Sequence, residues 1–301
     1  MTLLSVFNYL CSMKVVSNLI KDIRRHYAET LQHLYDEREA NSIIMLLLEH
    51  FFGYDKVTLA MNPELRLSES ELLTFHFAVK ELLKHRPVQY IIGETEFCEM
   101  TIKVNENVLI PRPETEEMTR QIIKACSRQR HYNIIDLCCG SGCIGIALAK
   151  HLSDCNVTGT DISEKAIATA CNNASINNVE VKFLTDDVMS PSDIVTSRQY
   201  DIIVSNPPYV RISEKKSMHK NVLDHEPHSA LFVEDSEPLI FYESILKNFA
   251  STLKTGGMLW FEINEAFGKE VVSLCNQNGF RNTECIKDIN GRDRFVKSIK
   301  E

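Results

Sequence analysis

The stretch "IIDLCCGSGCIGIALA", residues 134–149, decides the fold of this chain. An apolar run ends at Cys139, and the spacing GxGxxG follows at Gly140, Gly142 and Gly145, where an apolar helical pattern begins. A glycine loop between a strand and a helix lets the backbone approach a ligand closely. The 301 residues include only eleven glycines, so three within six positions argue against accident. The segment predicts a strand, a nucleotide-type cofactor loop and a helix.

The alternation of strand and helix continues almost to the end of the chain. The expected strands are "NIIDLCC", "NVTGTDI", "VEVKFLT", "YDIIVSN" and "GGMLWFEI". Helical patterns between apolar strands predict a parallel sheet with helices on both faces. Near the end, Asn290 and Gly291 lie between two strand-like runs, which is a strong hairpin signal. We therefore expect an α/β fold with a Rossmann-like sheet whose last strand is antiparallel.

The first part of the chain has a different pattern. From Ser17 to His85 apolar residues recur at helical spacing, Gly53 is placed to end a helix, and Ser68 with Glu71 fits a capping box. Alternating and β-branched residues then suggest a hairpin. The predicted organisation is a small N-terminal helical domain at residues 1–85, a β-hairpin linker at 86–110 and a cofactor-binding α/β domain at 111–301.

Composition and charge exclude several classes of protein. A net charge of −8 argues against a surface that grips nucleic acid, because such affinity comes from lysine and arginine. The apolar run "IIMLLL" is too short to span a bilayer, and residues 1–12 lack the features of a signal peptide. Met13 is an alternative start, with residues 1–12 as an optional extension. We expect a cytoplasmic protein with no membrane partner.

Cysteine and histidine spacing does not predict a metal site. The ten cysteines include no CxxC pair, and reduced thiols are typical of the cytosol. The segment "DHEPH" contains His225, Glu226 and His228, but it lacks the HExxH spacing that puts two histidines on one helix face. No metal ligand is expected.

Acidic residues around the glycine loop indicate the cofactor. Asp161 lies 21 residues beyond Gly140, at the end of the next strand, where it can accept hydrogen bonds from ribose hydroxyls. Asp136, directly before the loop, would repel a pyrophosphate and attract a cation. These residues favour S-adenosylmethionine, which carries a sulfonium and no phosphate, over the alternative NAD.

The segment "YDIIVSNPPYV", residues 200–210, predicts the catalytic group. Two prolines stiffen the chain where it leaves the strand, on the side where an open parallel sheet binds its ligand. The side-chain oxygen of Asn206 and the carbonyl of Pro207 can both accept hydrogen bonds from one planar NH2 group. They would orient its nitrogen toward a methyl donor and stabilise the developing positive charge, while Tyr209 stacks on the planar group.

Seven segments together carry a family resemblance. They are "RPVQYIIGETEF", "LIPRPETE", "DLCCGSGCIGIALA", "GTDIS", "YDIIVSNPPYV", "LDHEPHSALF" and "GRDR". Over nearly its full length the chain resembles the PrmC/HemK family of peptide chain release factor glutamine methyltransferases. "NPPY" alone is shared with adenine-N6 methyltransferases, whereas "PRPETE" ahead of the glycine loop is much more specific.

The resemblance implies a reaction and a partner. The family transfers methyl from S-adenosylmethionine to the side-chain amide nitrogen (N5) of the glutamine in the Gly-Gly-Gln motif of class 1 peptide chain release factors. The helical domain would then recognise that protein substrate, with no direct nucleic-acid substrate. One alternative is a nucleic-acid adenine-N6 amino-methyltransferase, which would need a positive groove. Another is a cofactor-binding protein without catalysis, against which the intact Asn206 and Tyr209 argue.

The resemblance also implies which residues form the site. The cofactor residues are Cys138, Cys139, Gly140, Ser141, Gly142, Asp161, Asp187, Val188 and Asn206. The substrate residues are Asn206, Pro207, Pro208, Tyr209 and Arg112, with Phe97, Glu114 and Thr115 closing the site from the linker side. Cys138 stands where the family commonly has glycine, so we expect the turn there to avoid positive φ.

Overall fold

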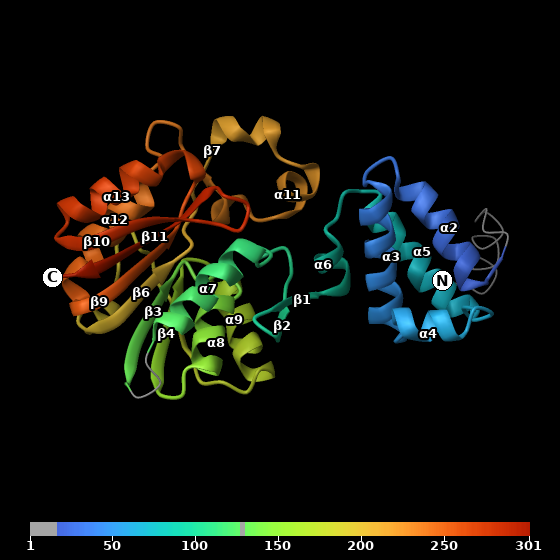
Figure 1. The fold of residues 1–301 in the computed structure, drawn as a ribbon, viewed down its shortest axis with the longest axis horizontal. Helices are drawn as coiled ribbons and strands as arrows, with labels where there is room; N and C mark the ends of the chain where they lie inside the picture. The colour runs from blue at the N-terminus through green and yellow to red at the C-terminus, as the bar shows by residue number, and fades with distance from the viewer. Residues whose placement is uncertain (1–16, 127–129) are drawn as a thin grey trace. The chain divides into compact units, whose positions relative to one another are not determined.

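The computed structural model describes residues 17–126 and 130–301 (Figure 1). The expectations for residues 1–12 and Met13 therefore lie outside the described residues. The described chain divides into two compact units: residues 17–92 with Lys220–His225, and residues 93–219 with 226–301. No helix among the described residues is long and apolar enough to cross a membrane.

The first unit is helical. Its helices are α2 (Ile20–Leu31), α3 (Glu37–Phe52), α4 (Lys56–Met61), α5 (Glu69–Leu82), α6 (Val88–Ile92) and α11 (Lys220–His225). Helix α3 ends at Gly53, whose φ of 71° permits the left-handed cap, and α5 begins with the predicted capping box of Ser68 and Glu71. Leu47 and Phe75 are fully buried in its core. The small helical domain expected at the N-terminus is confirmed.

The segment between the two predicted domains contains a helix as well as a hairpin. Helix α6 follows Pro87, whose carbonyl accepts hydrogen bonds from the amides of Tyr90 and Ile91. The hairpin pairs β1 (Glu94–Phe97) with β2 (Met100–Lys103) in antiparallel register. The β-branched residues of "VQYII" thus form a short helix, since proline fits a first helical turn well. The boundaries 1–85, 86–110 and 111–301 stay a prediction.

A seven-stranded sheet forms the centre of the second unit, in the order β10-β11-β9-β6-β3-β4-β5. Its strands are β3 (Tyr132–Leu137), β4 (Cys155–Asp161), β5 (Lys182–Thr185), β6 (Tyr200–Ser205), β9 (Leu253–Glu262), β10 (Phe280–Lys287) and β11 (Asp293–Lys300). The five strands from β5 to β9 are parallel, and β11 pairs antiparallel with β9. All five predicted parallel strands and the antiparallel last strand are confirmed.

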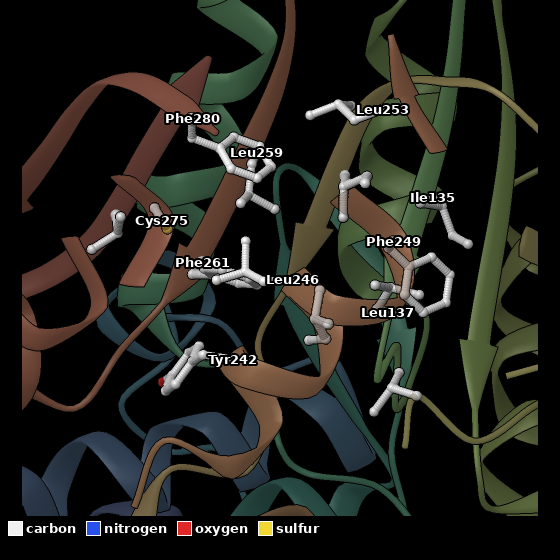
Figure 2. Close-up of a cluster of buried hydrophobic side chains, with 14 of the residues drawn as sticks. Ile135, Leu137, Tyr242, Leu246, Phe249, Leu253, Leu259, Phe261, Cys275 and Phe280 are labelled. Carbon is white, nitrogen blue, oxygen red and sulfur yellow. The ribbon is translucent and has the colours of Figure 1, made fainter. Parts of the chain in front are cut away.

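Helices cover both faces of the sheet. They are α7 (Pro113–Ala125), α8 (Cys143–His151), α9 (Glu164–Ile176), α10 (Asp193–Thr196), α12 (Ile240–Phe249) and α13 (Gly268–Gln277). Side chains alternate along β3, so Ile135 and Leu137 join the core beneath α12 and α13, as Figure 2 shows, while Asp136 faces α8. The short strands β7 (Val210–Arg211) and β8 (Phe232–Val233) form a separate parallel pair.

Short 3₁₀ turns connect several of these elements. They are η1 (Ile212–Ser217), η2 (His228–Ala230), η3 (Ala250–Thr252) and η4 (Glu265–Phe267). The turn between β10 and β11 holds the predicted hairpin signal. Gly291 has a φ of 82°, and its amide donates to the carbonyl of Asp288 at 2.9 Å. Glycine is needed there because the left-handed region disfavours other residues.

Truncating the core beneath α12 should destabilise the second unit. Phe249 is 1% exposed and packs in the cluster shown in Figure 2. We expect Phe249→Ala to lower the free energy of unfolding by about 3–5 kcal/mol, through lost burial and the cavity left behind. Urea denaturation measures this. The control Ile289→Ala removes a side chain that is 89% exposed and should change stability by less than about 0.5 kcal/mol. Equal effects of the two changes would contradict the assigned core.

Candidate active site

Two neighbouring parallel strands bring the predicted functional segments to one edge of the sheet. Strand β3 pairs with β6 so that Leu137 lies opposite Ser205. The hydroxyl of Ser205 also donates to the carbonyl of Leu137 at 2.7 Å. The glycine loop follows directly after β3, and Asn206 follows directly after β6. Both segments therefore leave the carboxyl edge side by side, as the sequence predicts.

Backbone hydrogen bonds fix the glycine loop. The amide of Cys139 donates to the carbonyl of Thr160 at 2.8 Å, and the amide of Gly140 donates to Oδ2 of Asp161 at 2.9 Å. Gly140 and Gly142 have φ values of 53° and 77°. A Cβ added at Gly142 would meet the Phe183 ring at 2.7 Å. One added at Gly140 would meet no atom within 4 Å, which leaves space in front of the loop.

The expectation that Cys138 avoids positive φ is wrong. Its φ is 59°, so a residue with a Cβ occupies the left-handed region at the end of β3. That conformation costs about 1–2 kcal/mol for a non-glycine residue. The hydrogen bonds of Cys139 to β4 and of Gly140 to Asp161 require the chain to turn at this point, and they offset the cost.

The sequence suggested that Asp136 places a negative charge next to the cofactor, but the structure directs this side chain away from the cavity. Its side chain is fully buried, and its Oδ2 accepts a hydrogen bond from the amide of Gly145 in α8 at 2.9 Å. Burial raises the pKa of Asp136 to about 7. The residue supports the junction between strand and helix from behind the loop, because its strand position directs it toward α8.

Asp161 anchors the loop from the next strand. Its Oδ2 accepts from Gly140, and its Oδ1 accepts from the amide of Ser163 at 2.9 Å. Burial raises the pKa of Asp161, and the two backbone hydrogen bonds oppose that rise. The carboxylate is thereby held at the mouth of the loop with lone pairs left for a ligand.

A cavity of about 300 Å³ opens in front of these segments. The predicted residues that line it are Cys138, Cys139, Gly140, Ser141, Asp161, Asp187, Val188, Asn206, Pro208, Arg112 and Thr115. The predicted residues Gly142, Pro207, Tyr209, Phe97 and Glu114 do not line it. Phe97 is 1% exposed and fully buried in the β1–β2 hairpin. The cavity thus joins most of the expected cofactor and substrate residues.

Several lining residues were not predicted. They are Asn107, Val108, Leu109, Pro111, Cys143, Ile144, Ile162, Ser163, Ala166, Asp186, Met189, Pro227, Ser229, Ala230 and Phe241. Ile162 and Ser163 directly follow Asp161, and Asp186 and Met189 flank the predicted pair, so extending each motif by one or two positions would have found them. Phe241 lies in an ordinary helical pattern and gives no such signal.

The cavity has an acidic lining. Asp161, Asp186 and Asp187 supply three carboxylates, and Arg112 supplies the one cation among the described lining residues. Arg112 is paired with the buried Glu226, whose Oε1 accepts its hydrogen bond at 2.6 Å. A positive ligand is favoured by this distribution, and a pyrophosphate is disfavoured.

The "NPPY" segment is held by a buried polar network. Asn206 Nδ2 donates to Thr115 Oγ1 at 3.2 Å, and Thr115 Oγ1 donates to Glu262 Oε2 at 2.6 Å. The Tyr209 hydroxyl donates to Oε1 of the same carboxyl at 2.9 Å. Burial raises the pKa of Glu262, while these two hydroxyl donors and the charge of Arg294 oppose the rise. Helix α7, the segment after β6 and the end of β9 meet at this carboxyl.

Known proteins resemble the chain along most of its length. The family model described as "PrmC N-terminal domain" matches residues 22–93, and the model described as "Methyltransferase small domain" matches residues 101–230. A release factor glutamine methyltransferase of Flavobacterium psychrophilum is 44% identical over 282 residues, which cover 93% of this chain and 98% of that protein. The chain belongs to the release factor glutamine methyltransferase family.

A second relative supports the same membership. The release factor glutamine methyltransferase of Bacteroides thetaiotaomicron is 40% identical over 274 residues, which cover 91% of this chain and 98% of that protein. The family resemblance inferred from the sequence motifs is confirmed, as is the methyltransferase fold with its N-terminal helical domain. The chain is an S-adenosylmethionine-dependent methyltransferase.

The cavity fits this methyl donor. S-adenosylmethionine carries a positive sulfonium, and three carboxylates line the cavity. The space in front of Gly140, where an added Cβ would meet nothing within 4 Å, leaves the loop backbone open to a ligand. Asp161 offers lone pairs to hydroxyl donors beside that loop. The residues present thus agree with a cationic nucleoside cofactor.

Neutralising Asp161 should weaken cofactor binding. In Asp161→Asn the amide has one acceptor oxygen, so it cannot accept from both Gly140 and Ser163 while also facing a ligand hydroxyl. We expect the Kd for S-adenosylmethionine to rise about 10–100-fold, by loss of one or two hydrogen bonds to a charged group. Isothermal titration calorimetry measures this. The control Asp154→Asn removes an exposed carboxylate outside the cavity and should leave the Kd unchanged. An unchanged Kd in Asp161→Asn would refute the role of this carboxylate.

Proposed function

We propose that the chain transfers the methyl group of S-adenosylmethionine to the side-chain amide nitrogen (N5) of the glutamine in the Gly-Gly-Gln motif of class 1 peptide chain release factors. The observation that carries the proposal is the position of "NPPY". Asn206 and Pro208 line the same cavity as the glycine loop, at the adjoining strand end. The names of the relatives, which cover nearly the whole chain, support the substrate.

The proposed cofactor residues surround the loop end of the cavity. They are Cys138, Cys139, Gly140, Ser141, Gly142, Asp161, Asp187, Val188 and Asn206, and all but Gly142 line the cavity. Gly142 acts through the conformation of the loop, since its φ of 77° and the contact with Phe183 leave no room for a side chain. When bound, S-adenosylmethionine supplies an electrophilic methyl group on its sulfonium.

The proposed catalytic residues act by orienting a weak nucleophile. The nitrogen of a carboxamide is weak because its lone pair is delocalised into the carbonyl. Asn206 Oδ1 and the Pro207 carbonyl accept the two hydrogens of the substrate amide and stabilise the positive charge that develops on its nitrogen. As the bond from that nitrogen to the methyl carbon would form, the bond from the methyl carbon to the sulfur of the donor would break and leave a neutral thioether. The nitrogen would then be acidic, and one of its hydrogens would leave as a proton. No strong base is required.

Peptide mapping tests the substrate. The purified chain is incubated with S-adenosylmethionine and a class 1 release factor, and added methyl groups are located by mass spectrometry. We expect one methyl group on the glutamine of Gly-Gly-Gln, and none on a release factor in which that glutamine is replaced by glutamate. Methylation of adenine in nucleic acid, with none on the release factor, would contradict the proposal.

Because release factors act on ribosomes, the proposed reaction is cytoplasmic.

Truncating Asn206 should separate catalysis from cofactor binding. Asn206→Ala removes one of the two proposed acceptors at the reacting nitrogen. Loss of one such preorganised group typically lowers kcat by about 10²–10³-fold. We expect a decrease of that size in kcat, and a change of less than about threefold in the Kd for S-adenosylmethionine, because many other residues line the cavity. Single-turnover kinetics measures the rate of methyl transfer, and isothermal titration calorimetry measures the Kd for S-adenosylmethionine. Unchanged turnover would refute the acceptor role.

A further inference from the structure

The network beneath "NPPY" connects the proposed acceptor Asn206 to a buried carboxylate. Thr115, in the first turn of α7, lies between Asn206 and Glu262, although Thr115 and Glu262 are 147 residues apart in the chain. Glu262 ends β9 and is 1% exposed, and Thr115 is 3% exposed. Burying polar groups costs free energy unless each group is hydrogen-bonded, and here the Thr115 hydroxyl and both carboxyl oxygens of Glu262 have partners. We therefore expect this network to have a specific role.

The direction of the hydrogen bonds is fixed by the number of hydrogens. Both oxygens of the Glu262 carboxyl accept hydrogen bonds, Oε1 from the Tyr209 hydroxyl and Oε2 from Thr115 at 2.6 Å, and the Thr115 hydroxyl has only this one hydrogen to donate. The Thr115 oxygen can then only accept from Asn206, so Asn206 must present its NH2 group to Thr115. Its oxygen is left on the other side of the planar amide. Among the described residues, none donates a hydrogen bond to that oxygen.

We propose that Glu262 and Thr115 are positioning residues that set the orientation of the Asn206 amide, so that its oxygen faces the substrate nitrogen. Without them the amide has two orientations, related by exchange of its oxygen and its NH2 group. In the wrong orientation Asn206 presents a donor to a substrate group that is itself a donor. This inference rests on the proposed function for its substrate, a carboxamide nitrogen, but its structural part does not.

Several groups hold Glu262 in place. Tyr209 donates to its second oxygen at 2.9 Å, and the Tyr242 hydroxyl donates to its backbone carbonyl at 3.1 Å. Burial raises the pKa of Glu262, and the charge of Glu114 in α7 adds to that rise, whereas the two hydroxyl donors and the charge of Arg294, from β11, lower the pKa. Arg294 is itself held in place by Asp288, whose Oδ2 accepts a hydrogen bond from Arg294 Nε at 3.4 Å. The carboxylate is therefore a rigid end point for the chain of hydrogen bonds that leads to Asn206.

Thr115→Val tests the inference with little change of shape. Valine is close in size to threonine but has no hydroxyl, so Asn206 loses its fixed partner. We expect kcat on a release factor to fall about tenfold or more, the effect of losing one oriented hydrogen bond. The Kd for S-adenosylmethionine should change less than about threefold. Thr115→Ser keeps the hydroxyl and should restore most of the lost kcat.

Thr119→Val is the matched control. Thr119 lies one turn further along α7, is 0% exposed, and donates its hydroxyl to the Thr115 carbonyl at 2.8 Å. The change removes an equally buried hydroxyl and leaves the hydrogen bonds that link Glu262, Thr115 and Asn206 in place. It should lower stability to a similar extent as Thr115→Val and leave kcat unaltered. An equal loss of kcat in both variants would show a general effect of destabilising α7 and would overturn the inference.

Glu262→Gln tests the direction of the hydrogen bonds. Its amide can donate to the Thr115 oxygen, which frees the Thr115 hydrogen to turn toward Asn206 and favours the wrong orientation. We expect kcat to fall at least as far as in Thr115→Val. Because Thr115 and Glu262 act in one series of hydrogen bonds, kcat of the double variant should be no more than about threefold below that of the worse single variant. Multiplication of the two single losses would overturn the proposed coupling.

A measurement without methyl transfer separates this inference from the proposed function. Asparagine is labelled with 15N, and the side-chain NH2 signals of Asn206 are identified by their absence in Asn206→Asp. In the wild type we expect one of these hydrogens to exchange slowly with water, and Thr115→Val to accelerate its exchange about tenfold, whereas Thr119→Val does not. Equal exchange in wild type and Thr115→Val would overturn the inference. A wild-type chain that shows the protected hydrogen but methylates no release factor would contradict only the proposed function.

Discussion

The parallel pairing of β3 with β6 is the constraint on which the rest of the structure depends. It sets Leu137 opposite Ser205, so the chain leaves both strands at the same level. The glycine loop and the "NPPY" segment are consequently neighbours by topology, before any side chain of the site is considered. Strand β9, on the other side of β6, ends at the same edge and brings Glu262 within hydrogen-bond distance of Thr115, which in turn accepts from Asn206. The backbone pairing of the two strands thus places the glycine loop next to Asn206, the proposed acceptor of the substrate amide.

Most of the fold could be predicted from the sequence because it depends on local patterns. Apolar β-branched runs mark the five parallel strands, and Asn290 with Gly291 marks the final hairpin. Gly53 and the Ser68 capping box locate helix ends in the first unit. The loop end of the cavity was also largely predictable, since the glycine loop and Asp161, which line it, belong to short motifs of fixed spacing.

The polar support of the site could not be predicted in this way. Glu262 looks like the polar end of an apolar strand, and its partner Thr115 is far away in the chain, so no periodicity links them. The positive φ of Cys138 arises from hydrogen bonds to the neighbouring strand that the local sequence does not encode. Similarly, Asp136 was placed on the cofactor side, although the strand alternation directs it to α8. In each case tertiary contacts override the local pattern.

We propose that a fixed Asn206 oxygen and the Pro207 carbonyl together receive the substrate amide. The most direct test is a crystal structure of the chain with S-adenosylhomocysteine and a peptide that contains Gly-Gly-Gln. We expect the glutamine side-chain nitrogen to lie within about 2.7–3.2 Å of both acceptors, with Asn206 Nδ2 still donating to Thr115. A glutamine nitrogen bound away from Asn206, or an Asn206 amide that turns its NH2 group toward the substrate, would contradict it.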